Sequence, residues 1–273
     1  MSEGSKKTLL ILGGTGEAAA LAAKADALWG ERVRIINSLA GRVEEPAALA
    51  GEVRIGGFGG AAALALYLKE QKVDAVIDAT HPFAMKISAH AREACDAAKI
   101  PRLVFVRPPW TRKAGDRWVE VPDFSSAAEA LPWVGRRIFL TIGHKGLESF
   151  SHLHGPEHPN MWFLLRFVSL PQMPLPLGEP GRNYEIIQDR GPFSLEEECR
   201  LMSGNQINVL VSKASGGEAT SAKIMAARKL KLPVVLISRP NPERGEKTSD
   251  PGEVISWLGE KLSLVGAAAP RRA

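Results

Sequence analysis

The first hundred residues alternate short apolar runs with stretches in which apolar residues recur every three or four positions. Short runs bounded by turn residues are typical of buried strands, and the longer period indicates helices. The pattern predicts strands at Thr8–Leu12, Arg32–Asn37, Gly51–Ile55, Ala75–Asp78 and Arg102–Val106. It predicts helices at Glu17–Leu28, Ala61–Gln71 and Ile87–Ala98. Such alternation builds a parallel sheet through right-handed crossovers.

A second alternating series follows the residues from Arg107 to Pro132, whose prolines, tryptophans and charges predict an irregular connection. Its expected strands are Arg137–Ile142, Trp162–Val168, Glu185–Gln188, Asn208–Ser212 and Val234–Ile237. Its expected helices are His144–Phe150, Ser194–Ser203, Ala219–Leu230 and Pro251–Leu262. The proline-rich stretch 170–181 is expected to be a loop.

The fold class that this pattern predicts is α/β, with two Rossmann-like domains whose parallel sheets are flanked by helices. We place the first domain at residues 1–133, the second at 134–265 and a frayed tail at 266–273. Ligands of such sheets bind at the carboxyl ends of the strands. We therefore expect an active-site cleft between the two domains.

Composition limits the class of protein further. Hydrophobic residues make up 45% of the 273 positions and charged residues 24%, as in ordinary globular proteins. Cys95 and Cys199 are the two cysteines, without metal-type spacing, so we expect neither a disulfide framework nor a metal site. The N-terminal residues lack the apolar core of a signal peptide, and no run approaches the roughly 18 apolar residues of a membrane span. These features predict a cytoplasmic protein without a membrane partner.

The chain is basic, with a formal net charge of +5. Nucleic acid and a polyanionic small molecule are both natural partners for such a charge. Aromatic residues are only 6%, and no motif for binding DNA or RNA is present. The small molecule is therefore the favoured partner, and we expect no nucleic acid.

The segment LLILGGTGEAAA, residues 9–20, passes from an apolar strand through glycines into a helix. Gly14, Gly16 and Ala19 match G-x-G-x-x-G/A, which places a pyrophosphate against backbone N–H groups and a helix N-terminus. Gly13 and Thr15 complete the turn. A strand-to-helix turn also needs glycines for purely conformational reasons, so that alternative stays open. Glu17 is expected to point away from the phosphates.

The end of the second strand distinguishes the two nicotinamide dinucleotides. NAD-binding proteins place a carboxylate there to bind the ribose, but this chain has Asn37 and Ser38, with Arg42 close by. A hydroxyl and a guanidinium suit a 2′-phosphate, so the sequence favours NADP. The alternative is that Ser38 caps a helix and Arg42 is a surface charge. Gly57, in the GGFGG turn after the third strand, is expected to approach the same cofactor; the alternative is a flexible turn without a ligand.

Four further loops carry candidate chemistry. Thr80 and His81 follow the fourth strand, where the nicotinamide half of a cofactor lies, so His81 is a candidate proton donor and Thr80 a candidate contact for the carboxamide or ribose. The loops of the second half supply hydroxyls, cations and free N–H groups suited to carboxylates. Their candidate residues are Lys145, Asp189, Arg190, Ser212, Lys213 and Thr220.

Taken in order, these motifs resemble those of the precorrin-6A reductases of cobalamin biosynthesis. The resemblance runs from about Leu9 to Leu262 through GGTGE, SLAGR, GGFGG, DATHPFA, RPPW, DRGPF, SKASGG and PVVLISRP. It implies reduction of one double bond of the precorrin-6A macrocycle by NADPH to give precorrin-6B. It also implies that the basic loops hold the carboxylates of this tetrapyrrole. The proton comes from Asp189, His81 or water, and the product can pass to neighbouring pathway enzymes.

Two other classes share the same glycine turn. One is a transferase that uses S-adenosylmethionine or a nucleotide sugar, and the other is a non-catalytic module that senses NADPH and binds a protein. The fold alone does not separate these classes from a reductase.

Overall fold

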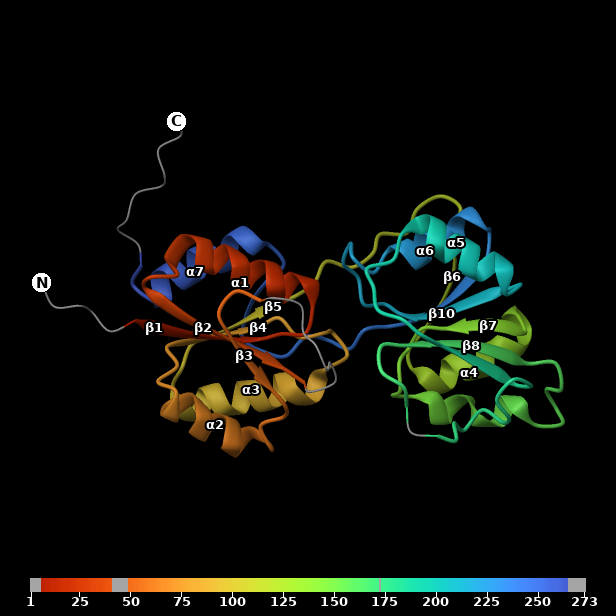
Figure 1. Cartoon of the computed structure of the whole chain (residues 1–273), viewed down its shortest axis with the longest axis horizontal. Helices are drawn as coiled ribbons and strands as arrows, with labels where there is room; N and C mark the ends of the chain where they lie inside the picture. Colours follow the sequence, from red (N-terminus) through yellow and green to blue (C-terminus); the bar gives the residue numbers. More distant parts are fainter. Residues whose placement is uncertain (1–5, 41–48, 172, 265–273) are drawn as a thin grey trace, which may run out of the picture. The chain divides into compact units, whose positions relative to one another are not determined.

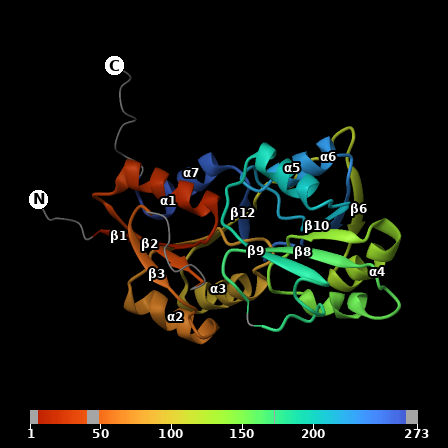
Figure 2. The ribbon, with the colours of Figure 1, turned by 45° about the vertical axis from the view of Figure 1, so that its right-hand side comes forward.

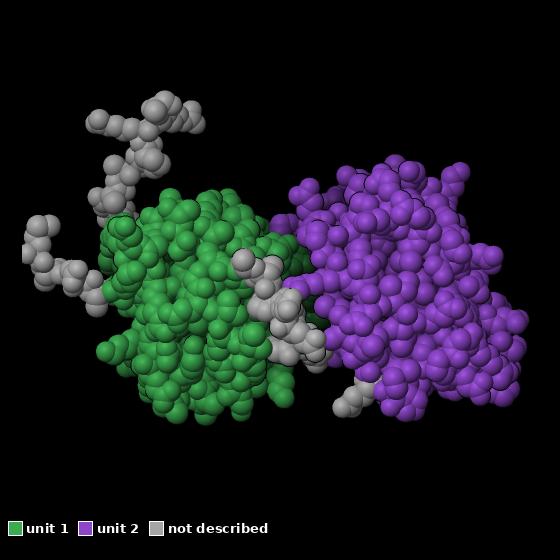
Figure 3. All heavy atoms as spheres, in the orientation of Figure 1, with its two compact units in different colours: residues 1–107, 240–273 green, residues 108–239 purple. Residues whose placement is uncertain are grey.

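A computed structural model describes residues 6–40, 49–171 and 173–264 (Figure 1). Two compact units divide the chain: unit 1 combines residues 1–107 with 240–273, and unit 2 comprises residues 108–239 (Figure 3). This division differs from the expected one at 133/134. The chain enters unit 2 at Pro108 and returns to unit 1 at Pro240, so unit 1 is built from two separate stretches of sequence.

Unit 1 contains, among its described residues, one parallel sheet of six strands in the order β12-β5-β4-β1-β2-β3. The strands are β1 (Lys7–Leu12), β2 (Val33–Leu39), β3 (Glu52–Ile55), β4 (Ala75–Asp78), β5 (Arg102–Phe105) and β12 (Glu246–Thr248). The order reverses between β1 and β4, as in dinucleotide-binding folds. The short strand β12, which the apolar pattern did not indicate, extends this sheet beside β5.

Helices cover both faces of this sheet. They are α1 (Gly16–Trp29), α2 (Ala61–Glu70), α3 (Met85–Ala98) and α7 (Pro251–Lys261). Figures 1 and 2 show α1 and α7 on one face and α2 and α3 on the other. Because successive side chains of a strand point to opposite faces, Leu9 and Ile11 pack with α1 and α7, while Leu10 and Leu12 pack with α2 and α3.

Unit 2 also contains six parallel strands among its described residues, in the order β6-β11-β10-β7-β8-β9. They are β6 (Arg117–Val121), β7 (Arg137–Leu140), β8 (Trp162–Phe167), β9 (Tyr184–Gln188), β10 (Val209–Lys213) and β11 (Pro233–Ile237). The order reverses between β7 and β10. Its helices are α4 (Phe124–Val134), the 3₁₀ helix η1 (Leu147–His154), α5 (Leu195–Gly204) and α6 (Ala222–Lys229). Helices α5 and α6 lie on one face and α4 on the other (Figure 2).

The expected irregular connection from Arg107 to Pro132 is wrong, because β6 and most of α4 lie inside it. Asp123 caps α4 by accepting a hydrogen bond from Ser126 N at 2.8 Å, and Leu131 is buried. Pro132 falls in the last turn of the helix, which ends at Val134. Strand β6 is an edge strand with mostly exposed residues, so it has no apolar run.

The helix expected at residues 144–150 begins later. Gly146 has φ 89°, a left-handed conformation that an α-helix cannot include, so the 3₁₀ helix starts at Leu147. The predicted tail, residues 266–273, lies outside the described residues.

Candidate functional site

The ends of β1, β2 and β4 meet at the glycine turn of unit 1. Gly13 N donates to Ser38 O at 3.0 Å, and Ala79 N donates to Leu12 O at 3.0 Å. Three neighbouring strands therefore end beside one another where the strand order reverses. This edge is where open α/β sheets bind their ligands.

The glycines of the turn serve different purposes. Gly14 has φ +92°, in the left-handed region that glycine adopts without strain. A Cβ atom on Gly13 would lie 3.2 Å from the Ala18 side chain, so Gly13 permits close packing of the strand and helix. A Cβ atom on Gly14 or Gly16 would meet nothing within 4 Å. These two positions border open space that a pyrophosphate can fill.

Thr15 fixes the start of helix α1. Its hydroxyl accepts from Ala18 N at 3.1 Å and donates to Ala79 O at 2.9 Å, which ties the turn to β4. Other N–H groups of the first turn remain available to an anion, and the dipole of the 14-residue helix favours negative charge there. The turn therefore fits a dinucleotide pyrophosphate.

Glu17, the acidic residue of the turn, is neutralised within unit 1. Its Oε2 lies 2.7 Å from Nη2 of Arg107, whose side chain is only 8% exposed. The paired guanidinium offsets the repulsion that an ionised Glu17 would exert on a phosphate. The sequence did not indicate this pair, because the two residues are 90 positions apart.

The last residues of β2 are where the sequence predicts the adenosine half of a cofactor. Asn37 is buried and donates to Ala50 O at 2.7 Å, which is a structural role. Ser38 lies inside β2, so a helix-capping role for it is excluded. Arg42 lies outside the described residues.

Arg54 is a cationic residue of this region that the sequence analysis missed. It stands opposite Ser38 in the β2–β3 register, and it donates to Gly56 O at 2.5 Å and to Gly57 O at 3.0 Å. Its guanidinium carbon lies 3.8 Å from the centre of the Phe58 ring. Arg54 thus shapes the GGFGG turn beside the end of β2. The sequence did hold a sign of this role, because Arg54 lies in the strand segment GEVRI, which leads directly into the glycines.

Thr80 and His81 are half-buried at the end of β4. The Thr80 hydroxyl donates to Asp78 at 2.8 Å. Nδ1 of His81 accepts a hydrogen bond from Phe83 N at 3.2 Å, so the neutral imidazole carries its proton on Nε2. His81 in this form is a hydrogen-bond donor through Nε2.

In unit 2, the strand order reverses between β7 and β10, where the loops that follow these two strands meet. The Lys213 ammonium donates to Ile142 O, which joins the end of β10 to the loop after β7. Thr141 donates to Val211 O at 2.9 Å, and the buried Ser212 hydroxyl donates to Lys213 O at 3.2 Å. Lys213 therefore places a cation at the ligand-binding edge of this sheet.

Within unit 2, Pro108 and Trp110 of the RPPW motif pack against the SKASGG loop. Trp110 Nε1 donates to Gly217 O at 2.8 Å, and Gly217 N donates to Pro108 O at 3.1 Å. Gly216 has φ +66°, and a Cβ there would lie 2.1 Å from Pro108 O. The predicted contact Thr220 donates to Gly216 O at 2.7 Å and so stabilises the same loop. Lys145, in the loop after β7, is exposed.

Asp189 and Arg190 lie away from this reversal point. They follow β9, an edge strand two positions from β7, and both are exposed. Asp189 Oδ1 accepts from Arg190 N at 2.7 Å, as in a local turn. Behind this loop, Arg166 pairs with the buried Glu198 at 2.6 Å and stacks on the Phe193 ring at 3.7 Å.

The described residues contain neither a cluster of metal ligands nor a membrane-spanning helix. Within residues 6–40, 49–171 and 173–264, no group of three or more His, Cys, Asp or Glu side chains is arranged to hold a metal ion. No helix in the same part of the chain has the length and apolarity to cross a membrane.

The strand order and glycine turn of unit 1 place this chain among the dinucleotide-binding α/β proteins. Residues 8–259 match the family model described as precorrin-6x reductase CbiJ/CobK. A precorrin-6A reductase from Rhodococcus erythropolis is 44% identical over 252 residues, which are 92% of this chain and 97% of the relative. One from Rhodobacter capsulatus is 42% identical over 252 residues, 92% of this chain and 96% of the relative.

A solved structure of CobK precorrin-6A reductase superposes with a TM-score of 0.84 at 40% identity. It covers 97% of this chain, and this chain covers 99% of it. The chain belongs to the precorrin-6x reductase family, whose members act in cobalamin biosynthesis. It is therefore an oxidoreductase, as the motifs of the sequence indicated.

Proposed function

We propose that this chain uses NADPH to reduce one double bond of precorrin-6A, giving precorrin-6B. The names of the relatives support the substrate. The observation that carries the cofactor is the glycine turn at the reversal point of unit 1. It opens beside a second strand that ends in Asn37-Ser38-Leu39, without a carboxylate. A carboxylate at that point would favour NAD and repel a 2′-phosphate.

The proposed reaction adds two hydrogens across one double bond of the macrocycle. Bound NADPH would supply the hydride to one ring carbon and would itself be oxidised to NADP⁺. A proton must reach the neighbouring carbon, either from a side chain or from water. The protein has to align the two reactants and exclude water from them.

The residues of unit 1 have distinct roles in this proposal. Backbone N–H groups of Gly14, Thr15 and Gly16 bind the pyrophosphate, as the open space beside the two glycines allows. Ser38 and Arg42 bind the 2′-phosphate, and Arg54 contributes a second guanidinium to the same region. His81, protonated on Nε2, is one candidate source of the proton.

The loops of unit 2 would bind the acetate and propionate groups of the substrate. Lys213 is the best supported contact, because its ammonium stands where the strand order reverses. Arg190 and the exposed Lys145 add cations, and Asp189 is the second candidate proton donor. The hydroxyls of Ser212 and Thr220 donate to backbone carbonyls of this loop, so their part in the proposal is to fix its shape.

The test is an anaerobic assay of the full chain with precorrin-6A and either NADPH or NADH. The expected result is one NADPH oxidised for each precorrin-6A consumed, a product heavier by two hydrogens, and much slower use of NADH. Arg42→Ala is expected to narrow this preference. Equal use of both cofactors by the wild type would contradict the 2′-phosphate assignment, and tight S-adenosylmethionine binding without a response to NADPH would favour a transferase.

A further inference from the structure

A chain of hydrogen bonds lies at the end of β4. Asp78 is the last residue of this strand, and its side chain is 1% exposed. Its Oδ1 accepts from the Thr80 hydroxyl at 2.8 Å. Thr80 Oγ1 lies 3.1 Å from the hydroxyl oxygen of Ser88 on α3.

The direction of these hydrogen bonds follows from the groups present. A carboxylate has no proton to donate, so the contact with Asp78 uses the one proton of Thr80. The contact with Ser88 then requires Ser88 to donate. The chain therefore runs from Ser88 to Thr80 to Asp78, and Thr80 can only accept a hydrogen bond from any further partner.

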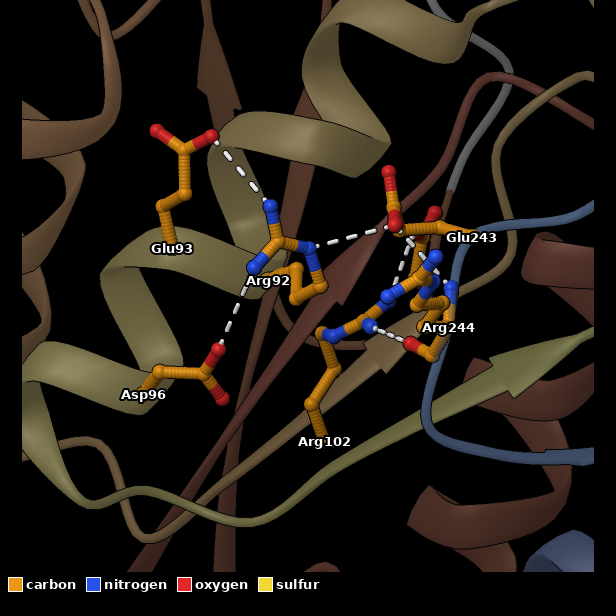
Figure 4. A network of polar contacts seen from close by, with 7 residues as sticks. Arg92, Glu93, Asp96, Arg102, Glu243 and Arg244 are labelled. Carbon is orange, nitrogen blue, oxygen red and sulfur yellow. Dashed lines mark hydrogen bonds and ion pairs between the residues drawn. The ribbon is translucent and has the colours of Figure 1, made fainter.

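Asp78 is held in place by a buried ion pair. Its Oδ2 lies 3.4 Å from Nη1 of Arg102 on β5, whose side chain is 5% exposed. Arg102 also donates to Arg244 O, and Glu243 pairs with Arg92 of α3 at 3.1 Å. Figure 4 shows Arg92 and Arg102 directed toward Glu243 and Arg244. Arg102 of β5 thus holds the Asp78 carboxylate, and the backbone of Arg244 holds the Arg102 guanidinium.

We propose that Thr80 accepts a hydrogen bond from the carboxamide N–H₂ of the nicotinamide, and that Asp78 is the positioning residue that imposes this role. The proposal rests on the proposed NADPH site, because β4 adjoins β1 at the reversal point where the nicotinamide half of the cofactor lies. An amide nitrogen can only donate, so it matches a partner that can only accept. Fixing the carboxamide fixes which face of the nicotinamide ring meets the substrate.

The experiment follows deuterium from NADPH labelled at one or the other hydrogen of its reactive carbon. Wild type is expected to transfer deuterium to the tetrapyrrole from only one of the two labelled forms, as mass spectrometry of the product would show. Thr80→Val keeps the shape but removes the acceptor, so transfer from both forms is expected, with about a 3- to 10-fold weaker affinity for NADP⁺. Thr80→Ser keeps the acceptor and is expected to retain transfer from one face.

Asp78→Asn tests the positioning role. Arg102 will attract the amide oxygen, which turns the new amide nitrogen toward Thr80. Thr80 then accepts from that nitrogen, and its own proton can turn toward Ser88 or outward. Thr80 is no longer held as an acceptor only, so reduced facial selectivity is expected although the volume is unchanged. Circular dichroism would show whether this variant folds. If it does not, the comparison of Thr80→Val with Thr80→Ser still tests the contact between Thr80 and the carboxamide.

The outcomes separate the proposals. Complete facial selectivity in Thr80→Val overturns the carboxamide contact while the reductase function stands. Weaker NADP⁺ binding with unchanged selectivity also overturns it, since it assigns Thr80 to the ribose. A wild type that neither binds nor oxidises NADPH overturns the proposed function and this inference together.

Discussion

The two units use the same sheet plan but differ at the point where the strand order reverses. In unit 1 that point is the glycine turn after β1, where Gly14 and Gly16 border open space and α1 begins. In unit 2 it holds the side chain of Lys213, which reaches from β10 to the loop after β7. The first arrangement can bind an anion through main-chain N–H groups and needs small residues. The second binds through a cationic side chain and needs that charge.

The largest expected effect comes from filling the open space in unit 1. Gly16→Val places a side chain where the pyrophosphate would lie, so NADP⁺ affinity is expected to fall about 100-fold or more. The backbone φ of Gly16 is ordinary and the added atoms enter open space, so the unfolding temperature should move by only a few degrees. Calorimetric titration and thermal unfolding measure the two quantities.

Gly204→Val is a matched control for this variant. Gly204 ends α5 in unit 2, and a Cβ there also meets nothing within 4 Å. It should leave NADP⁺ affinity unchanged. An equal loss of affinity in both variants would mean that Gly16 acts through overall stability and not through the cofactor site.

The next largest effect concerns the cation of unit 2. Lys213→Met keeps much of the side-chain length but removes the charge, so KM for precorrin-6A is expected to rise about 10- to 100-fold, the value of a charged hydrogen bond. NADP⁺ affinity should stay at the wild-type value. Steady-state kinetics with Lys145→Met as a comparison would show whether position 213 is special, because Lys145 is exposed and should contribute less.

A smaller effect is expected at the adenosine end of unit 1. Arg54→Ala should lower the preference for NADPH over NADH by about tenfold, since it removes a guanidinium beside the end of β2. Arg34→Ala is the control, because Arg34 lies on β2 but pairs with Glu52 at 2.7 Å on the surface. A change in preference that is the same for both arginines would show that only the general charge of this region matters.

The smallest effect compares the two cysteines. Burial raises the pKa of the Cys95 thiol in unit 1 from 9.0 to about 12. The unfolded chain ionises this thiol near its ordinary pKa while the folded chain keeps it protonated. The stability that this group contributes is therefore complete below about pH 9 and is lost as the pH rises toward about 12.

Urea unfolding at about pH 8 and about pH 10.5 tests this sign. Cys95→Ala should lose less stability between the two pH values than the wild type does. Thiol labelling at the lower pH should modify Cys199 of unit 2, which is half-buried, before Cys95. Faster labelling of Cys95 would contradict its placement on the buried face of α3.

The sequence predicted most strands of both sheets within one or two residues, because their apolar runs are bounded by turns. It did not predict β6, whose residues face solvent at a sheet edge, or the discontinuous make-up of unit 1. That make-up depends on α7, which packs into the core of unit 1, and on β12, a three-residue strand whose Glu246 pairs with Leu103. A pairing so distant in sequence and so short leaves no periodic signal.

The candidate site likewise has features that the sequence could predict and features that it could not. The glycine turn was predictable, since its conformation and its open space both require glycine. The ion pair of Glu17 with Arg107 and the contact of Asp78 with Arg102 were not, because they join residues brought together only by the sheet order. Asp189 was selected for its chemistry, but the structure places it beyond an edge strand.

The central claim is that the glycine turn of unit 1 binds the cofactor and that Lys213 of unit 2 binds the substrate. The most direct test is a titration of NADP⁺ into three proteins: the wild type, Gly16→Val and Lys213→Met. We predict that Lys213→Met binds NADP⁺ as the wild type does, whereas Gly16→Val has lost most of its affinity. Weaker binding by Lys213→Met than by Gly16→Val would contradict the assignment of the cofactor to the glycine turn of unit 1.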